Sequence, residues 1–177
     1  MNETEIKLAY FDKERIIYRL KELGAVFKSN QEINDVYYSN KYNSLEEAKT
    51  FIRIRTKNKK SELTFKGEIS SNDDIWKRIE LNSGIENLDN VKKILELLGF
   101  KILLNNTTIR EYWILNDVEI AIINILEPAK VDYLELECDN EDKIKEVRLK
   151  LGGLVSSVKE DHFKKLDEAR KNEIDIG

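Results

Sequence analysis

The spacing of apolar and polar residues along the chain predicts a series of short β-strands with a few helices between them. Glu3 to Leu8 alternates between charged and apolar types and predicts the first strand. The next segment has apolar residues at helical spacing, with Asp12 as a candidate N-cap and Gly24 at its end, and predicts a helix. The same criteria predict strands near residues 35–39, 51–56, 62–67, 76–81, 108–115, 118–125 and 132–138, and helices ending at Gly99, near 140–151 and near 160–170.

The predicted elements occur in the order β-α-β-β-β twice, and the sequence carries a trace of the same duplication. A shift of 75 positions brings Leu20 onto Leu95 and Gly24 onto Gly99. It also brings Leu23, Asn30, Tyr37 and Glu5 onto Leu98, Asn105, Tyr112 and Glu80. Two such halves can close into one barrel without free edges. We therefore predict an α+β fold, a closed eight-stranded antiparallel β-barrel or tunnel with helices packed outside. We expect residues 1–170 to form this single domain and residues 171–177 to form a polar tail.

The composition is that of a charge-rich globular protein. Charged residues make up 36% of the 177 residues and hydrophobic residues 41%, and the formal net charge is -4. This negative charge argues against a general nucleic-acid binder, which needs positive charge to displace counterions from phosphates. The single cysteine, Cys138, excludes an intrachain disulfide and a four-cysteine zinc site.

The sequence also bears on where the protein works. Residues 1–20 lack the apolar core of a signal peptide, and no apolar run is long enough to cross a bilayer. We therefore expect a cytoplasmic protein without a membrane partner. The sequence leaves open whether the chain forms a homodimer.

The charged residues of several predicted strands occupy one face, because residues two apart in a strand project to the same side. Such a face is most often the solvated side of a sheet, where both signs are usually mixed. Here the signs are segregated, since Arg53 and Arg55 share one strand whereas Glu135 and Glu137 share another. Brought together in one barrel, these residues would form a cationic wall and an anionic floor. Neighbouring cations about 4 Å apart repel by roughly 4 kcal/mol at an effective dielectric of about 20. We therefore expect the cationic wall to stay without neutralisation until an anionic ligand binds.

A series of ordered motifs carries a family resemblance. The motifs are Glu3-Thr4-Glu5-Ile6-Lys7, Asp35-Val36-Tyr37-Tyr38, Phe51-Ile52-Arg53-Ile54-Arg55, Leu63-Thr64-Phe65-Lys66-Gly67, Arg78-Ile79-Glu80, Arg110 and Glu135-Leu136-Glu137. In this order and spacing they resemble the CYTH family, also called triphosphate tunnel metalloenzymes, which includes class IV adenylate cyclases and thiamine triphosphatases. The resemblance spans residues 3 to about 166. The predicted helix ending in Leu98-Gly99-Phe100 looks more like the cyclase-type branch.

The resemblance implies a role for each charged position. Divalent metal, Mg²⁺ or Mn²⁺, would be held by Glu3, Glu5, Glu135, Glu137 and, in the seventh strand, Asn124. The triphosphate would lie along Lys7, Arg53, Arg55, Lys66, Arg78, Arg110 and Lys159. The catalytic residues would be Glu5, Lys7 and Arg55. These residue types suit that chemistry, because carboxylates are hard oxygen ligands and arginine forks bind phosphate oxygens in pairs.

Two positions depart from the family pattern. Thr108 stands where relatives often carry lysine, which weakens one expected phosphate contact. Asn124 stands where the seventh strand usually carries aspartate, and asparagine is a poorer metal ligand that cannot act as a base. Catalysis could therefore be slower, or one metal site could be absent. The only histidine, His162, is interpreted as a surface or packing residue, and Lys159 is the better candidate for a phosphate contact.

The sequence thus predicts a metal-dependent enzyme that acts on a triphosphate substrate. The resemblance to class IV cyclases implies that the 3′-hydroxyl of ATP attacks the α-phosphate and that cyclic AMP and pyrophosphate are released. Attack of water on the terminal phosphate would instead make an inorganic or thiamine triphosphatase, and the shared motifs do not distinguish these outcomes. The replacements at Thr108 and Asn124 leave open a non-catalytic binder of triphosphate or polyphosphate. A purely structural barrel with solvated charged faces is a third hypothesis.

Overall fold

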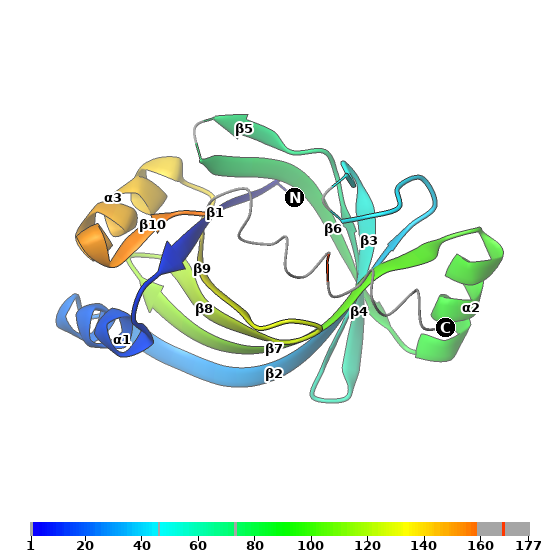
Figure 1. Cartoon of the computed structure of the whole chain (residues 1–177), viewed down its shortest axis with the longest axis horizontal. Coiled ribbons are helices and arrows are strands. Elements are labelled where there is room, and N and C mark those ends of the chain that lie inside the picture. The colour runs from blue at the N-terminus through cyan, green and yellow to red at the C-terminus, as the bar shows by residue number, and fades with distance from the viewer. Residues whose placement is uncertain (1, 46, 73, 159–167, 169–177) are drawn as a thin grey trace.

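The computed structural model describes residues 2–45, 47–72, 74–158 and 168, which form a β-barrel with helices on its outside (Figure 1). The strands are β1 (Asn2–Tyr10), β2 (Val26–Ser39), β3 (Phe51–Lys57), β4 (Lys60–Lys66), β5 (Ser70–Asn72), β6 (Ile75–Ile85), β7 (Lys101–Leu115), β8 (Val118–Glu127), β9 (Val131–Glu137) and β10 (Val155–Ser157). The helices are α1 (Lys13–Glu22), α2 (Leu88–Leu97), α3 (Glu141–Leu151) and a short 3-10 helix at Gly152–Leu154. None of the described helices has the length and apolar character needed to cross a membrane.

The main strands close into a ring. Neighbours follow the order β1-β9-β8-β7-β2-β3-β4-β6, and β6 then pairs with β1 to complete the barrel. The strand pairs are antiparallel, and the short strands β5 and β10 extend the sheet at β6 and β1. The prediction of a closed eight-stranded antiparallel β-barrel with helices outside is confirmed.

The register of the barrel contains an internal two-fold repeat. α1 and α2 are both 10 residues long and begin 75 positions apart, at Lys13 and Leu88. In the β1–β6 pair Glu3 lies opposite Arg78, and in the β2–β7 pair Ile33 lies opposite Thr108. Each of these pairs joins positions that are also 75 residues apart, so a pseudo-two-fold axis passes between the members of both pairs. The register therefore supports the duplication that the sequence indicates.

The two related helices begin and end with the same local signals. The side chains of Asp12 and Asn87 accept hydrogen bonds from first-turn amides of α1 and α2. Gly24 and Gly99 follow the helices with φ of +78° and +80°, a left-handed conformation that glycine adopts at least cost. These caps fix the point at which each helix leaves the barrel.

Two apolar clusters of unequal size hold the helices on the barrel. α1 and α3 lie together on one side (Figure 1) and share the larger cluster with outward side chains of β1, β8 and β9, among them Ile6, Leu8, Ile120, Leu134 and Leu136. α2 packs alone on the other side over a smaller cluster, Val36, Tyr38, Ile54 and Leu95. Fully burying one large aliphatic side chain contributes about 1.5–3 kcal/mol. The outward faces are therefore fixed, and the alternate residues of each strand must point into the barrel.

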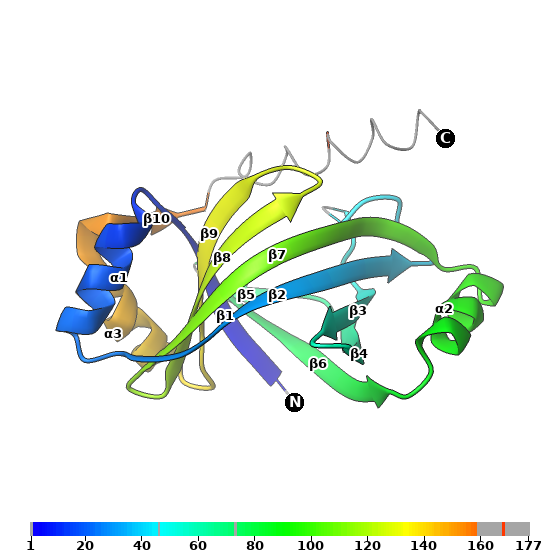
Figure 2. The same ribbon diagram turned by 90° about the horizontal axis from the view of Figure 1, so that it is seen from below.

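Some elements differ from the sequence prediction. β2 and β7 are longer than expected, because their first halves lack strict alternation and become strands by pairing with each other along their length (Figure 2). β5 and β10 contain three residues each, too few to give a periodic signal. The predicted helix near 160–170, the tail at 171–177, and the residues Lys159 and His162 lie outside the described residues.

Candidate functional site

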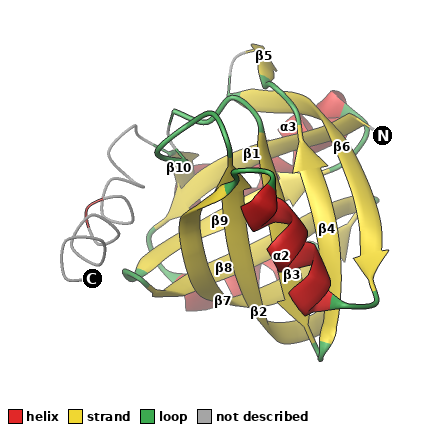
Figure 3. Cartoon of the chain, turned by 90° about the vertical axis from the view of Figure 1, so that its right-hand side faces the viewer, coloured by secondary structure: helices red, strands yellow, loops and turns green. Residues whose placement is uncertain are grey.

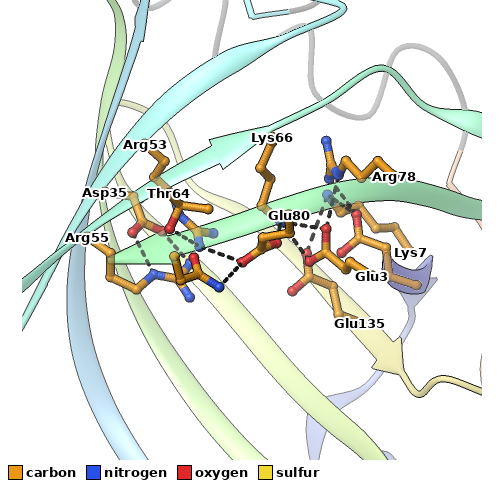
Figure 4. Close-up of polar contacts among 12 residues, drawn as sticks. Glu3, Lys7, Asp35, Arg53, Arg55, Thr64, Lys66, Arg78, Glu80 and Glu135 are labelled. Atoms are coloured by element: carbon orange, nitrogen blue, oxygen red, sulfur yellow. Dashed lines mark hydrogen bonds and ion pairs between the residues drawn. The ribbon is translucent and has the colours of Figure 1, made fainter. Parts of the chain in front are cut away.

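The barrel encloses a cavity of about 400 Å³. Charged side chains from β1, β3, β4, β6, β7 and β9 line it, and these include Glu3, Glu5, Lys7, Arg53, Arg55, Lys66, Arg78, Arg110, Glu135 and Glu137. Figure 4 shows such side chains in a row, from the arginines beside Asp35 to the group around Glu3 and Lys7. Opposite charges from distant parts of the chain thus converge inside one closed sheet.

Strand alternation accounts for this placement. On β1, Ile6 is buried in the outer core beneath the helices, which leaves Glu5 and Lys7 on the opposite face, inside the cavity. On β9, Leu136 is buried in the same outer core and Glu135 points inward. The apolar residues under the helices therefore orient the charged residues of the tunnel.

A buried aspartate holds two arginines at one end of the cavity. Asp35 on β2 is fully buried and accepts hydrogen bonds from Arg55 Nε at 2.7 Å, Arg55 Nη2 at 2.8 Å and Arg110 Nη2 at 3.1 Å. Burial alone would raise the pKa of Asp35, but the hydrogen bonds and positive charge of the arginines lower it to about 2. The carboxylate is therefore ionised at neutral pH and fixes the direction of both guanidinium groups.

Arg53, beside this group, has an unused donor. Its Nη2 donates to Thr64 Oγ1 at 3.3 Å and lies 3.7 Å from a carboxylate oxygen of Glu80. Its Nε is buried and has no hydrogen-bond partner among the described residues. A buried donor without a partner costs about 1–3 kcal/mol. An anion in the cavity would supply a partner of the right charge.

Glutamates pair with Lys66 and Arg78 in the middle of the cavity. Lys66 Nζ lies 2.6 Å from Glu3 and 2.7 Å from Glu80, and Arg78 donates to Glu3 at 3.0 Å and to Glu5 at 2.7 Å. Burial opposes ionisation, but the neighbouring cations lower the pKa of Glu5 and of Glu80 to about 2. Glu3 behaves differently, because burial and the Glu5 charge raise its pKa above 4.5 despite Lys66 and Arg78.

Lys7 lies between two carboxylates. Its Nζ is 3.4 Å from Glu5 and 3.4 Å from Glu135, and 4.9 Å from the ring centre of Trp76. Burial alone would lower the pKa of Lys7, but the two carboxylates raise it above 10.5. Lys7 is therefore held as a cation, which suits it to neutralise negative charge and not to accept a proton.

Three glutamates form a row across neighbouring strands. Glu5 on β1 lies opposite Glu137 on β9, and Glu137 lies opposite Glu119 on β8. Glu119 and Glu137 make no ion pair with any residue that the structure describes. Glu137 is an exposed residue at the end of β9, but partial desolvation by the surrounding protein and the nearby carboxylates raise its pKa to about 7. Of this row, Glu5 is paired with Arg78 and Lys7, whereas Glu119 and Glu137 have no cation paired with them among the described residues.

The carboxylate oxygens at this end suit a divalent cation, because Mg²⁺ and Mn²⁺ prefer such ligands. Within the described ranges, no three acidic, histidine or cysteine side chains converge closely enough to enclose an ion. The reason is visible in the contacts, since Glu3 and Glu5 point toward Lys66 and Arg78 instead. Holding a metal would require these two side chains to turn, whereas Glu119 and Glu137 have no ion pair to break.

The structure corrects the role expected for Asn124. Alternation along β8 turns its side chain away from the cavity, where it hydrogen-bonds to Tyr10 and Asp132 and accepts a bond from Lys13. The inward residue of β8 in the carboxylate row is Glu119, which the sequence alignment missed. Asn124 therefore does not belong to the metal-ligand set.

The prediction that the cationic wall stays without neutralisation until a ligand binds is also wrong. Each basic side chain of the cavity has a carboxylate oxygen within 3.7 Å: Lys7, Arg53, Arg55, Lys66, Arg78 and Arg110. Asp35 and Glu80 supply part of this negative charge. The signal for both lay in the motifs that contain them, because Asp35 lies opposite Arg55 of the neighbouring strand and Glu80 lies opposite Lys66 of its neighbouring strand.

Thr108, which stands where relatives often carry lysine, makes structural contacts of its own. Its side chain is fully buried, and its Oγ1 accepts a hydrogen bond from Arg110 Nε at 3.2 Å and donates one to the Ile33 carbonyl at 3.4 Å. Thr108 therefore supports the orientation of Arg110.

Comparisons with known proteins agree with this geometry. The family model for the CYTH domain matches residues 1–151. A protein of Methanocaldococcus jannaschii named "putative adenylate cyclase" is 33% identical over 138 residues, which cover 77% of each chain. The solved structure of the PH1012 protein from Pyrococcus horikoshii has a TM-score of 0.71 at 26% identity over 90% of this chain and 93% of its own.

One further structure supports the fold alone. It is a Hippeastrum protein described as a "putative adenylyl cyclase" with a dominant triphosphatase activity, with a TM-score of 0.68 at 16% identity over 91% of this chain and 94% of its own. The motifs, the closed barrel and the family model point to one assignment, and the chain belongs to the CYTH domain family.

Proposed function

We propose that the chain is a divalent-metal-dependent enzyme that binds a triphosphate in its tunnel and acts on it as a class IV adenylate cyclase does. The observation that carries this proposal is the meeting of fixed arginines and a row of carboxylates in one cavity. Phosphate oxygens and a metal ion need these two environments side by side. The name of the Methanocaldococcus jannaschii relative supports the cyclase reaction over the alternatives.

The arginine end is the proposed place for the phosphates. Arg55 and Arg110 are oriented by Asp35, and Arg53 has a buried donor without a partner among the described residues. Lys66, Arg78 and Lys7 extend the positive charge along the cavity. Lys159 stays a proposed phosphate contact that lies outside the described residues. Donors fixed before the substrate arrives need no reorganisation when charge develops in the transition state.

The carboxylate end is the proposed place for the metal. The ligands would come from Glu3, Glu5, Glu135 and Glu137, together with Glu119. Mg²⁺ or Mn²⁺ bound there would offset the charge of the phosphate oxygens and polarise the phosphorus under attack. Burial and repulsion between carboxylates raise the pKa of Glu137, and a cation would remove the repulsion.

Ligand binding must exchange the ion pairs now present in the tunnel. Glu3 and Glu5 occupy Lys66 and Arg78. A phosphate that binds these cations frees the two carboxylates, and the freed carboxylates can then turn toward the Glu119 and Glu137 side. Triphosphate and metal are therefore expected to favour each other's binding.

The proposed reaction joins the 3′-oxygen of ATP to the α-phosphorus while the bond from that phosphorus to the bridging oxygen breaks. Pyrophosphate leaves with the electron pair, and the hydroxyl proton is lost to water. Arg55 and Lys7 would neutralise the charge that builds on the phosphates, and Glu5, ionised by its neighbours, would position the reacting end. Catalysis would rest on positioning and charge neutralisation.

Product analysis tests the proposal. The protein is incubated with ATP, thiamine triphosphate or inorganic tripolyphosphate, each with Mg²⁺ or Mn²⁺ and with chelator as the control. Cyclic AMP with pyrophosphate is the expected result. Orthophosphate would replace the cyclase assignment with a triphosphatase, and tight binding without product would make the protein a binder.

A purely structural barrel gives a separate result. A ligand at about 100 times its dissociation constant stabilises a protein by about 2.7 kcal/mol. Tripolyphosphate that leaves the unfolding temperature unchanged at all concentrations would therefore exclude both an enzyme and a binder of this ligand.

A further inference from the structure

α3 packs on an apolar surface of the barrel, which we call its seat, and this packing shows how the outside of the barrel is covered. α3 buries Ile144, Val147 and Leu151 in the larger apolar cluster, together with outward residues of β1 and β9. Within that seat Ile6 on β1 lies opposite Leu136 on β9. α1 lies beside α3 and contacts it (Figure 1).

The internal two-fold repeat places a second seat on the opposite half. The shift of 75 positions takes Ile6 to Leu81 and the neighbouring Leu8 to Ser83. Leu81 lies opposite Phe65 and Ser83 opposite Leu63 on β4, as Ile6 and Leu8 lie opposite residues of β9. The outer face of β4 and β6 is therefore the counterpart of the surface on which α3 packs.

No described helix occupies this second seat. Figure 3 shows α2 lying over β2 and β3 with β4 and β6 uncovered beside it. A groove of about 210 Å³ lies here, lined by Ile52, Leu63, Phe65, Leu81, Asn82 and Ser83. Phe65 is 40% exposed, Leu81 57% and the adjacent Ile79 54%. Ile52 and Leu63 also pack against the α2 cluster, so the groove runs directly beside α2.

α2 carries a second apolar stripe that its counterpart lacks. Ile94, Leu97 and Leu98 share one face of the helix at i, i+3, i+4 spacing and are 54%, 75% and 63% exposed. In α1 the position equivalent to Ile94 is Arg19, whose Nε donates to the Lys150 carbonyl of α3. Ile94 of α2 is thus apolar at the position whose counterpart in α1, Arg19, bonds to the neighbouring helix α3.

The groove and the stripe are both uncharged. The lining of the groove and the three stripe residues are all uncharged in a chain that is 36% charged, so bringing them together removes no charge from water. Their exposed large side chains present on the order of 500 Å² of apolar surface, which is the upper range for a monomer. A stable interface buries about 800 Å² on each partner, so the apolar surface would supply the centre of such an interface and a polar rim the remainder.

We propose that this face joins two copies of the chain in a symmetric dimer. The exposed stripe of α2 from each copy lies in the β4–β6 groove of the other and fills the seat that α3 fills in the covered half. A groove and a complementary ridge on the same face are the arrangement that a two-fold interface requires, because each copy must offer both.

Sedimentation velocity at micromolar concentration tests the dimer with matched variants. The wild type and Leu149→Lys should sediment as dimers, because Leu149 is 80% exposed on α3 and lies on the other side of the barrel. Leu97→Lys should raise the dissociation constant of the dimer at least tenfold. At concentrations where both proteins are monomeric, its unfolding temperature should match that of the wild type, which shows that the fold is kept. A monomeric wild type, or a Leu97→Lys variant that dimerises normally, overturns the proposal.

Cross-linking tests the arrangement of the interface. In a Cys138→Ser background, a Leu97→Cys chain is mixed with a Leu81→Cys chain and treated with a short bis-maleimide. Cross-linked heterodimer is expected, and a Leu149→Cys chain mixed with the same partner should give none. If Leu97→Cys fails to react with Leu81→Cys, another surface or another occupant, such as residues 159–177 of the same chain, covers the groove and the proposal is wrong.

Discussion

The arginine end and the carboxylate end of the tunnel differ in where their counter-charges come from. At the arginine end, the fully buried Asp35 bonds Arg55 and Arg110 at 2.7 to 3.1 Å. At the carboxylate end, Glu119 and Glu137 stand in register with Glu5 and form no ion pair with a described residue. The first end is neutralised from within, whereas Glu119 and Glu137 at the second have no paired cation among the described residues and could take one from outside.

This difference assigns separate tasks to the two ends. Buried ion pairs hold the arginines in one direction before a ligand arrives, at the cost of desolvating the charges. The carboxylate row is held by strand register, and its mutual repulsion falls when a cation binds. Loss of the buried counter-charge at the arginine end is therefore expected to lower stability, whereas loss of a carboxylate from the row is expected to lower metal affinity.

The largest effect is expected from Asp35→Asn, which removes the counter-charge of the arginine end. Removing one partner of a buried ion pair costs about 3–5 kcal/mol because the other charge stays buried. Denaturant unfolding should show this loss of stability, and tripolyphosphate should restore part of it by pairing with Arg55 and Arg110. The matched change Asp117→Asn breaks an exposed pair with Lys143 and should cost far less stability, because solvent screens that pair. Equal losses in the two variants would contradict the role of Asp35.

The next effect concerns turnover. Arg53→Ala removes a proposed phosphate donor, and losing one donor of this kind typically lowers kcat by about 100- to 1000-fold. Glu137→Ala should also abolish turnover, through the metal. Both variants should keep their fold, which circular dichroism and thermal unfolding can check. Arg19→Ala, on the outer surface, should turn over normally, and unfolding of Arg53→Ala would show that this side chain is structural.

A smaller effect should link the two ends. If phosphate binding frees Glu3 and Glu5 from Lys66 and Arg78, as proposed, the affinity for tripolyphosphate should rise when Mn²⁺ is present. Coupling energies of this kind are about 1–3 kcal/mol, or roughly 5- to 150-fold in affinity. Calorimetric titrations with and without the metal measure it, and Mn²⁺ affinity must rise by the same factor when tripolyphosphate is added. Independent binding of the two would contradict the proposed exchange of partners.

The smallest effect is a pH dependence at the carboxylate end. The pKa of Glu137 is raised from 4.5 to about 7, so its stabilising contribution in the metal-free protein is present below about pH 4.5 and is lost as pH rises through about 7. Because a proton and a metal compete for this carboxylate, Mn²⁺ affinity should fall by about tenfold per pH unit below 7. Glu137→Gln should bind Mn²⁺ more weakly and lose this part of the slope. A slope unchanged by the substitution would assign it to another group.

The sequence predicts the barrel well because strand alternation and the helix caps are local signals. The charged residues Glu5, Lys7 and Arg53 lie in the cavity because their apolar neighbours must face the outer core. Their pairing cannot be read the same way, since Asp35 meets Arg110 only through the β2–β7 register.

The residues of β8 that face the cavity also could not be assigned from the sequence alone. Apart from Asn124, residues 121–125 of β8 are all apolar, so alternation gives no sign of which of them face inward. The register with β9 decides it, and it places Glu119 in the cavity opposite Glu137. Sequence reasoning therefore found the family and most of the lining, and missed the contacts that depend on strand pairing.

The most direct test is a crystal structure with Mn²⁺ and tripolyphosphate, in which anomalous scattering locates the metal. The expected result is a manganese peak at bonding distance from Glu137 and its neighbouring carboxylates, with phosphates on Arg53, Arg55 and Arg110. Phosphate and manganese bound outside the barrel, with the present ion pairs of the tunnel unchanged, would contradict the account.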